Sequence, residues 1–308
     1  MIQVMWLFVS IYEVNNMNTT KHINRGGDTQ KWQCYQYCYI REDYEKPLTE
    51  KLSFKQIEAE FLKNHPKQKA FFAQYITAFD VPEPTEWWFT IKDDEYDLSK
   101  LISKKRYEIT KAHKFCKAEE INPIECIEEL FECYKESFTA YPERYRPKEI
   151  LLEDFSKYIH KLYESDNKEF YATRFIENGK LIGFLIINHN GKYIGLAQQK
   201  TNPAFEKYNS NASLIDFVLT KYNEKLKSGE IVFTNGSRNI KHETNFNAYL
   251  EKYFGFRKAY AKLCVVYRFP FGIIVKLLKP FRKILEHSKN PFLYNIYCVL
   301  KMDSFANK

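Results

Sequence analysis

The chain of 308 residues is 44% hydrophobic and 28% charged, a composition that supports packed cores and excludes an intrinsically disordered protein. The net charge of +8 favours an anionic partner, and nucleic acid, a phosphorylated small molecule or a membrane surface would each satisfy it. Because no linker rich in Ser, Gly or Pro divides the chain, we expect two closely packed halves.

Cysteine usage and the first residues bear on the compartment. The seven cysteines include no Cys-x-x-Cys pair, which favours a reduced, cytoplasmic protein, and Cys34 and Cys38 lack a matching set of metal ligands. We therefore expect no metal. Residues 1–12 are apolar but lack the basic start of a signal peptide and are too short to span a membrane. They form a buried strand or precede a true start at Met17, so whether residues 1–16 belong to the native protein stays open.

The first third of the sequence predicts alternating strands and helices. Apolar alternation predicts strands at residues 32–40, 70–79 and 87–91, and helical periodicity predicts a helix at 53–63. The Val-Pro-Glu-Pro-Thr stretch at 81–85 suits a hairpin loop.

Asp97 is the predicted N-cap of the next helix, which has an apolar face and a basic face. The apolar arc consists of Leu98, Leu101, Ile102, Ile109 and Ala112. The lysine stripe consists of Lys100, Lys104, Lys111 and Lys114 around Tyr107, with Arg106 on a neighbouring face.

From Cys116 onward the predicted order is β-α-α-β-β-β-α-β-α-β. Its best hairpin signals are the turns at Gly179 and Gly191, which join three successive antiparallel strands. The remaining elements are expected at residues 116–121, 124–139, 148–164, 211–226, 230–234, a helix ending at 253, and 259–268.

The tail after the last strand is basic and amphipathic. Residues 271–286 place their apolar side chains on one side of a helical wheel and Lys276, Lys279, Arg282 and Lys283 on the other. Pro280 is expected to divide the segment into two short helices. Both contact with a membrane surface and packing against the body fit this pattern.

Gly255 and Phe256 end the last helix and precede the final strand. Glycine adopts the left-handed conformation that stops a helix at little cost, and the next apolar residue packs back over the helix end. The segment from Leu250 to Phe256, with the surrounding strand order, resembles the acyltransferases of the GNAT superfamily. This resemblance implies a GNAT-like mixed, mostly antiparallel sheet flanked by helices, of the α+β or α/β class.

A second resemblance covers residues 70–268. The series Arg106-x2-Ile109-x-Lys111-Ala112-x-Lys114 resembles the Arg-x-x-Ile-x-Lys-Ala-x-Lys helix of FemAB-like transferases, which are built from paired GNAT-type modules. It implies a reduced N-terminal GNAT-like half at 17–115, a C-terminal GNAT-like acyltransferase domain at 116–268, and the basic tail at 269–308. A solvated lysine face would give the same pattern.

The resemblance also implies where a donor would bind. GNAT enzymes hold the pyrophosphate of acyl-CoA with a glycine-containing loop that opens a helix, where backbone amides lack internal partners. The matching stretch here has no glycine and consists of Lys207, Asn209, Ser210, Asn211 and Ala212. Acyl-CoA, such as acetyl-CoA, and aminoacyl-tRNA are both candidate donors, because FemAB-like proteins that use aminoacyl-tRNA do not depend on these glycines. An ordinary N-cap region rich in Asn and Ser would have the same sequence.

The catalytic assignment is open. The general-acid tyrosine of the family stands four residues before the glycine, where this chain has Glu251. Tyr249 lies two residues away, and His242 and Glu243 could relay protons. Asn235, at the end of a strand, could donate a hydrogen bond to an oxyanion.

The acceptor is indicated by charge. Lys100, Lys104, Arg106, Lys111 and the Arg144-Tyr-Arg146 turn could bind a phosphorylated or lipid-linked precursor, or less favourably tRNA. DNA is not expected. We therefore expect a cytoplasmic, membrane-associated N-acyltransferase of cell-envelope or polysaccharide biogenesis that acts on an amino group. A catalytically degenerate scaffold and a nucleic-acid binder remain the alternatives.

Overall fold

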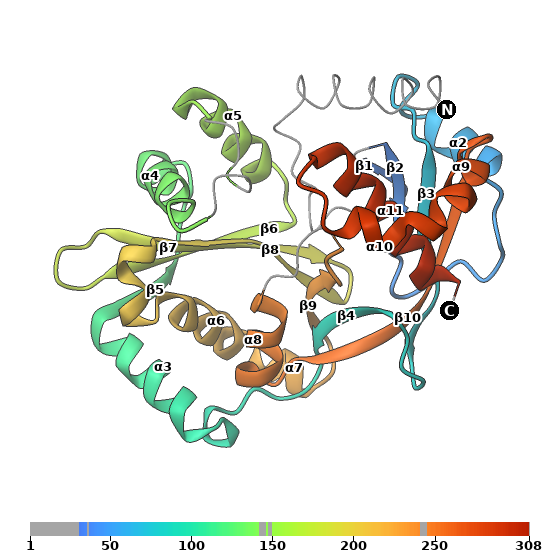
Figure 1. The fold of residues 1–308 in the computed structure, drawn as a ribbon. Coiled ribbons are helices and arrows are strands. Elements are labelled where there is room, and N and C mark those ends of the chain that lie inside the picture. The colour runs from blue at the N-terminus through green and yellow to red at the C-terminus, as the bar shows by residue number, and fades with distance from the viewer. Residues whose placement is uncertain (1–30, 36, 142–145, 147–149, 241–244, 308) are drawn as a thin grey trace.

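The computed structural model describes residues 31–35, 37–141, 146, 150–240 and 245–307. The strands of these residues form one mixed sheet in the order β1-β2-β3-β10-β4-β9-β8-β7-β6-β5 (Figure 1). Its strands are β1 (Gln33–Tyr35), β2 (Cys38–Arg41), β3 (Phe72–Val81), β4 (Trp87–Lys92), β5 (Cys116–Glu120), β6 (Lys168–Phe175), β7 (Leu181–Asn190), β8 (Tyr193–Thr201), β9 (Val232–Ser237) and β10 (Arg257–Tyr267).

Helices cover both faces of this sheet. Figure 1 shows α4 and α5 on one face and α3, α6 and α8 on the other. The helices are α2 (Phe54–Leu62), α3 (Ser103–Phe115), α4 (Ile127–Ser137), α5 (Leu152–Tyr163), α6 (Ser210–Lys221), α7 (Asn223–Lys227), α8 (Asn245–Phe254), α9 (Phe271–Leu278), α10 (Arg282–Glu286) and α11 (Pro291–Ala306). Short 3-10 turns are η1 (Leu98–Lys100), η3 (Pro203–Tyr208) and η4 (Lys279–Phe281).

The predicted run of three antiparallel strands is confirmed. β6 pairs with β7 and β7 with β8, and both tight turns contain a glycine with positive φ, +71° at Gly179 and +58° at Gly191. On the side of α4 and α5, strands β6 and β7 bury a core around Phe155, Phe170 and Phe184. This meander forms the rigid base of the C-terminal part of the sheet.

The junction of α8 and β10 also follows the sequence. Gly255 has a φ of +72°, and the amide of Phe256 donates to the carbonyl oxygen of Leu250 at 3.4 Å. Phe256 is buried beneath the helix end, in the core that α6 and α8 share. Glycine stops the helix here because its left-handed conformation turns the chain into the strand.

The predicted hairpin of residues 70–91 is wrong in its pairing. β10 lies between β3 and β4 and pairs antiparallel with both, its first half with β4 and its second half with β3. The intervening loop crosses over β10, where the Thr85 hydroxyl donates to the carbonyl oxygen of Ala261 at 2.9 Å. The partner strand β10 begins only at Arg257, far beyond the end of β4 at Lys92, and leaves no local signal in this stretch. The two short apolar strands therefore have the sequence pattern of a hairpin.

Three smaller differences concern element ends. The single strand predicted at 32–40 is two short paired strands, β1 and β2. The helix predicted to start at Asp97 is divided into η1, which Asp97 caps by accepting from the amide of Ser99, and α3. The helix predicted at 211–226 is likewise divided, at Tyr222, into α6 and α7.

The C-terminal tail is helical and packs partly on the body. Pro280 lies in η4 between α9 and α10, which confirms the predicted break. The unpredicted α11 packs against β10, and its Met302 joins the core around Ile76 and Phe89. Among the described residues, no helix is both long and apolar enough to cross a bilayer.

One sheet runs through the two parts that the sequence predicts at 17–115 and 116–268. β10 of the second part pairs with β3 and β4 of the first part. These domain boundaries stay a prediction.

Candidate functional site

The sheet opens between β8 and β9. These strands are parallel and pair only at their beginnings, from Tyr193 opposite Val232 to Gly195 opposite Thr234. Beyond that point β8 continues to Thr201 along β7, while β9 turns to pair with β4. Beyond Gly195, β8 has a hydrogen-bonded neighbour on only one side. Its backbone N–H and C=O groups on the other side therefore face the opening.

The first turn of α6 lies beside the opened part of β8. The side-chain amide Nε2 of Gln199 on β8 donates to Oδ1 of Asn211 at 2.7 Å, which connects the strand to the helix. Asn209 precedes the helix with φ +60° and ψ 41°, the left-handed conformation usually taken by glycine, and its side chain does not cap the helix. The first amides of α6 therefore lack a side-chain cap, which is the property that binds anions at helix starts.

The predicted donor residues gather at this helix start, and their side chains differ in exposure. Lys207 is exposed, with its ammonium 4.9 Å from the ring centre of Tyr208, whereas Ser210 and Ala212 are buried. Two further buried oxygens have no described hydrogen-bond partner, Oγ of Ser213 and Oε1 of Gln199. Because buried polar atoms in native structures are normally satisfied, unpartnered oxygens mark a place where a ligand or water would bind.

Asn235 lies on β9 directly after the last residue that pairs with β8. Its side chain is buried and its amide donates to Oδ1 of Asn247 on α8. On the adjacent β4, Phe89 and Ile91 point into the core on the opposite face, so alternation directs Thr90 toward α8. The Thr90 hydroxyl is buried without a described partner, so the α8 side of the opening carries another unsatisfied oxygen.

Glu251 lies on the same face of α8 as Asn247, because it follows Asn247 by one helical turn. Its Oε1 is buried without a described partner, and its Oε2 lies 3.9 Å from the ammonium of Lys258. Burial raises the pKa of the Glu251 carboxyl above its usual range, and Lys258 opposes this only in part. This environment favours the protonated form of the Glu251 carboxyl more than an exposed site would.

Tyr249 points to a different neighbourhood. Its hydroxyl accepts from the ammonium of Lys105 at 3.5 Å, and burial raises its pKa above the usual range. The Lys105 side chain is 1% exposed, lies 4.5 Å from the ring centre of Tyr249 and 4.2 Å from that of Tyr253, and pairs with Glu108. This contact docks α3 onto α8.

The lysine stripe proposed for the acceptor is only partly free. Lys100 pairs with Glu95 at 3.2 Å, and Arg106 donates to the carbonyl oxygens of Ser99 and Leu101. Lys104 is exposed and Lys111 half-buried on the outer side of α3. Arg106 thus holds the turn before α3, a role that the motif did not reveal.

Arg146 lies on the opposite face, at the end of α4. It donates to the carbonyl oxygens of Tyr141 at 2.8 Å and Thr139 at 3.0 Å. The ammonium of Lys200, on the opened part of β8, lies 4.0 Å from the ring centre of Phe138. The end of α4 therefore borders the opening from the side opposite to α6. The predicted Arg144, His242 and Glu243 lie outside the described residues.

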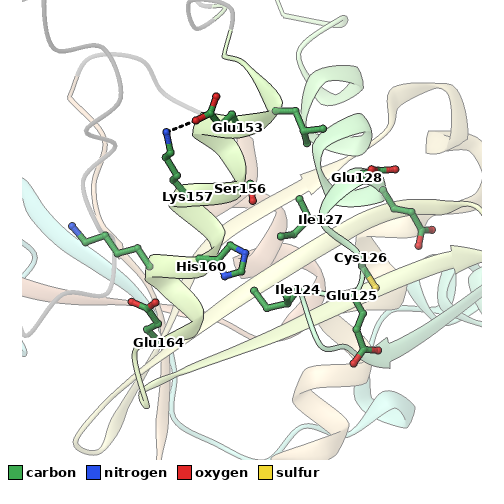
Figure 2. A pocket seen from close by; sticks show the side chains of 13 residues that line it. Ile124, Glu125, Cys126, Ile127, Glu128, Glu153, Ser156, Lys157, His160 and Glu164 are labelled. Atoms are coloured by element: carbon green, nitrogen blue, oxygen red, sulfur yellow. Dashed lines mark hydrogen bonds and ion pairs between the residues drawn. The ribbon is translucent and has the colours of Figure 1, made fainter.

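A groove of about 1010 Å³ lies elsewhere, between α4 and α5 (Figure 2). Figure 2 shows Ile124, Ile127 and His160 between the two helices, and Glu153 paired with Lys157 on α5. None of the catalytic, donor-binding or acceptor-binding residues predicted from the sequence lines this groove. Five glutamates line the groove beside Lys157 and Lys161, so its lining is more acidic than basic and does not favour an anionic donor.

Comparisons with known proteins identify the fold. No protein-family model matches the sequence, and a search of curated proteins also found no match. Among solved structures, FemX covers 78% of this chain with 83% of its own length, at 10% identity and a TM-score of 0.50. The match to L-PGS from Bacillus licheniformis covers 87% of this chain and 84% of the L-PGS chain, at 14% identity and a TM-score of 0.46. The match to a GNAT family acetyltransferase from Staphylococcus aureus covers 37% of this chain and 81% of the acetyltransferase chain, at 16% identity and a TM-score of 0.29.

The similarity to FemX is a likeness of fold. It confirms the FemAB-like, GNAT-type α+β fold expected from the sequence, with a mixed sheet flanked by helices.

Proposed function

We propose that the chain is an N-acyltransferase that carries an acyl or aminoacyl group to an amino group of a cell-envelope or polysaccharide precursor. The observation that carries this proposal is the opening between β8 and β9 beside the uncapped first turn of α6. An extended donor with amide groups can add to the free side of β8 as a further strand would, while its phosphates meet the helix start. Acyl-CoA has both features, and the 3′ end of aminoacyl-tRNA supplies an ester and phosphates.

The acceptor would approach from the other face. The end of α4, with Arg146 and the adjacent Lys200, borders the opening there and favours an anionic acceptor. Small phosphorylated or lipid-linked precursors fit this arrangement better than tRNA. Lys104 and Lys111, on the donor face, are then available for a bulky or polyanionic donor.

We assign proton transfer to Glu251, with Tyr249 as the competing group. In the reaction the acceptor nitrogen attacks the carbonyl carbon, the bond to the donor sulfur or oxygen breaks, and the leaving group takes a proton. The Glu251 carboxylate can take the proton that the acceptor nitrogen loses and then give it to the leaving sulfur or oxygen. The raised pKa and the unpartnered Oε1 support this role, whereas the Tyr249 hydroxyl already contacts Lys105. Asn235 would need to leave Asn247 to reach an oxyanion.

Donor binding tests the proposal. Titration with acetyl-CoA, longer acyl-CoAs and aminoacyl-tRNA should raise the melting temperature of the full chain with one of them, because a ligand that binds only the folded state stabilises it. At a donor concentration 100 times the dissociation constant the stabilisation is about 2.7 kcal/mol. Desulfo-CoA and uncharged tRNA separate recognition of the carrier from recognition of the acyl group. No response to any donor would favour the alternative, a catalytically degenerate scaffold, which the missing loop glycines also suggest.

A cytoplasmic location on the inner face of a membrane would suit a lipid-linked acceptor. This location is part of the proposal.

A further inference from the structure

Helices α9 and α10 carry apolar side chains on two different sides. The inner side packs on the body, with Phe271 stacked on Phe71 at 4.4 Å between ring centres and with Ile274 and Val275 buried. The apolar side predicted from the sequence is thus divided, and only half of it is covered.

The other half faces solvent. We call it the apolar stripe, and its side chains are between 52% and 82% exposed: Phe269, Ile273, Leu277, Phe281 and Ile284. From Ile273 onward the spacing of four, four and three residues keeps the members in line along α9, η4 and α10. Elsewhere among the described residues, exposed large apolar side chains stand singly or in pairs. Such a continuous exposed patch is typical of a binding surface.

The charge beside the apolar stripe selects among occupants. Residues 269–289 contain five basic residues and one acidic residue, Glu286, which accepts from the Tyr297 hydroxyl. Lys279 pairs with Asp303 at 2.7 Å, while Lys276, Lys283 and Lys289 are exposed. A second copy of the chain would place this positive surface against itself in a two-fold dimer, and like charges would oppose that contact. An anionic surface would instead attract it.

We propose that the apolar stripe binds an anionic membrane surface. The stripe enters the boundary between headgroups and acyl chains, and Lys276 and Lys283 contact the lipid phosphates, as in helices that lie in the membrane plane. This inference does not depend on the transfer reaction or on the β8–β9 opening.

Sedimentation with vesicles tests the proposal on the full chain. The protein should sediment with vesicles of phosphatidylcholine mixed with phosphatidylglycerol and remain in solution with phosphatidylcholine alone. Replacing Ile273, Leu277 and Ile284 together by Ser should weaken binding on the order of a hundredfold or more. Replacing Lys276 and Lys283 by Gln should weaken vesicle binding roughly tenfold to thirtyfold. The remaining binding should also depend less on the salt concentration than that of the wild type.

Matched controls are available on the surface. Ile176→Ser changes a side chain that is 54% exposed in the β6–β7 turn, and Lys51→Gln with Lys55→Gln removes the same charge from exposed positions near α2. Both controls should bind vesicles as the wild type does. Equal binding by the stripe variant, or no binding by the wild type, would overturn the proposal. A wild-type dimer that the stripe variant converts to a monomer in light scattering would assign the stripe to a second copy instead.

Discussion

Replacing Glu251 by Gln should lower the rate of transfer by about 10²- to 10⁴-fold while leaving donor affinity unchanged, because Gln keeps the shape of the side chain and loses the proton. Release of the CoA thiol from acetyl-CoA measures the rate, with glucosamine 6-phosphate as a phosphorylated amine probe. The matched variant is Tyr249→Phe, which removes the hydroxyl that contacts Lys105 and should retain the rate within a few-fold. A large loss of rate in Tyr249→Phe together with a nearly unchanged rate in Glu251→Gln would assign proton transfer to Tyr249.

The same substitution has a second effect that requires no substrate. A carboxyl whose pKa is raised in the folded state contributes its stability below the unfolded pKa and loses it as pH rises through the folded pKa. At neutral pH the buried carboxylate of Glu251 therefore destabilises the fold, and Gln should raise the free energy of unfolding. The difference should vanish in acid, below about pH 4, where Glu251 is neutral in both states. Urea unfolding at both pH values measures it, and destabilisation at pH 7 would contradict the buried environment.

Lys105 should be the most sensitive position for stability on the basic helix. Lys105→Ala leaves Glu108 without its partner and opens a cavity among Tyr249 and Tyr253, which together should cost about 3–5 kcal/mol. Lys105→Met fills the same space and should cost about 1 kcal/mol, because Glu108 remains 24% exposed and can turn to water.

Lys104→Ala is the matched control, since Lys104 is the exposed neighbour on the same helix. Its effect should stay within about 0.5 kcal/mol. Equal losses of unfolding free energy for the two alanine variants would show that Lys105 does not dock α3 onto α8.

Sequence and structure agree where the signal is local. The Gly255–Phe256 junction, the glycine turns of the β6–β7–β8 meander and the break at Pro280 each depend on backbone preferences within a few residues. The pairing of β10 between β3 and β4 depends on segments far apart in the chain, and no local pattern encodes it. α11 escaped prediction because its apolar residues are spread around the helix rather than along one face.

The positions of the candidate site residues in the fold could be predicted better than their contacts. The sequence predicts donor-binding residues at 207–212, which the structure shows around the start of α6, and the resemblance implies that Glu251 stands at the register of the family's general-acid tyrosine. The roles of these residues stay predictions. That Lys105 is buried could not be read from the helix alone, because a lysine stripe is normally solvated and the rings that cover this side chain belong to α8. The half of the tail that stays exposed likewise depends on which side meets Phe71.

Hydrogen exchange with and without donor tests the central claim most directly. The β8–β9 opening should hold the donor, so acetyl-CoA or aminoacyl-tRNA should slow amide exchange in residues 196–201 of β8 and in the first turn of α6, with no change in the groove between α4 and α5. Protection confined to the α4–α5 groove, or exchange in β8 that a bound donor leaves unchanged, would contradict it.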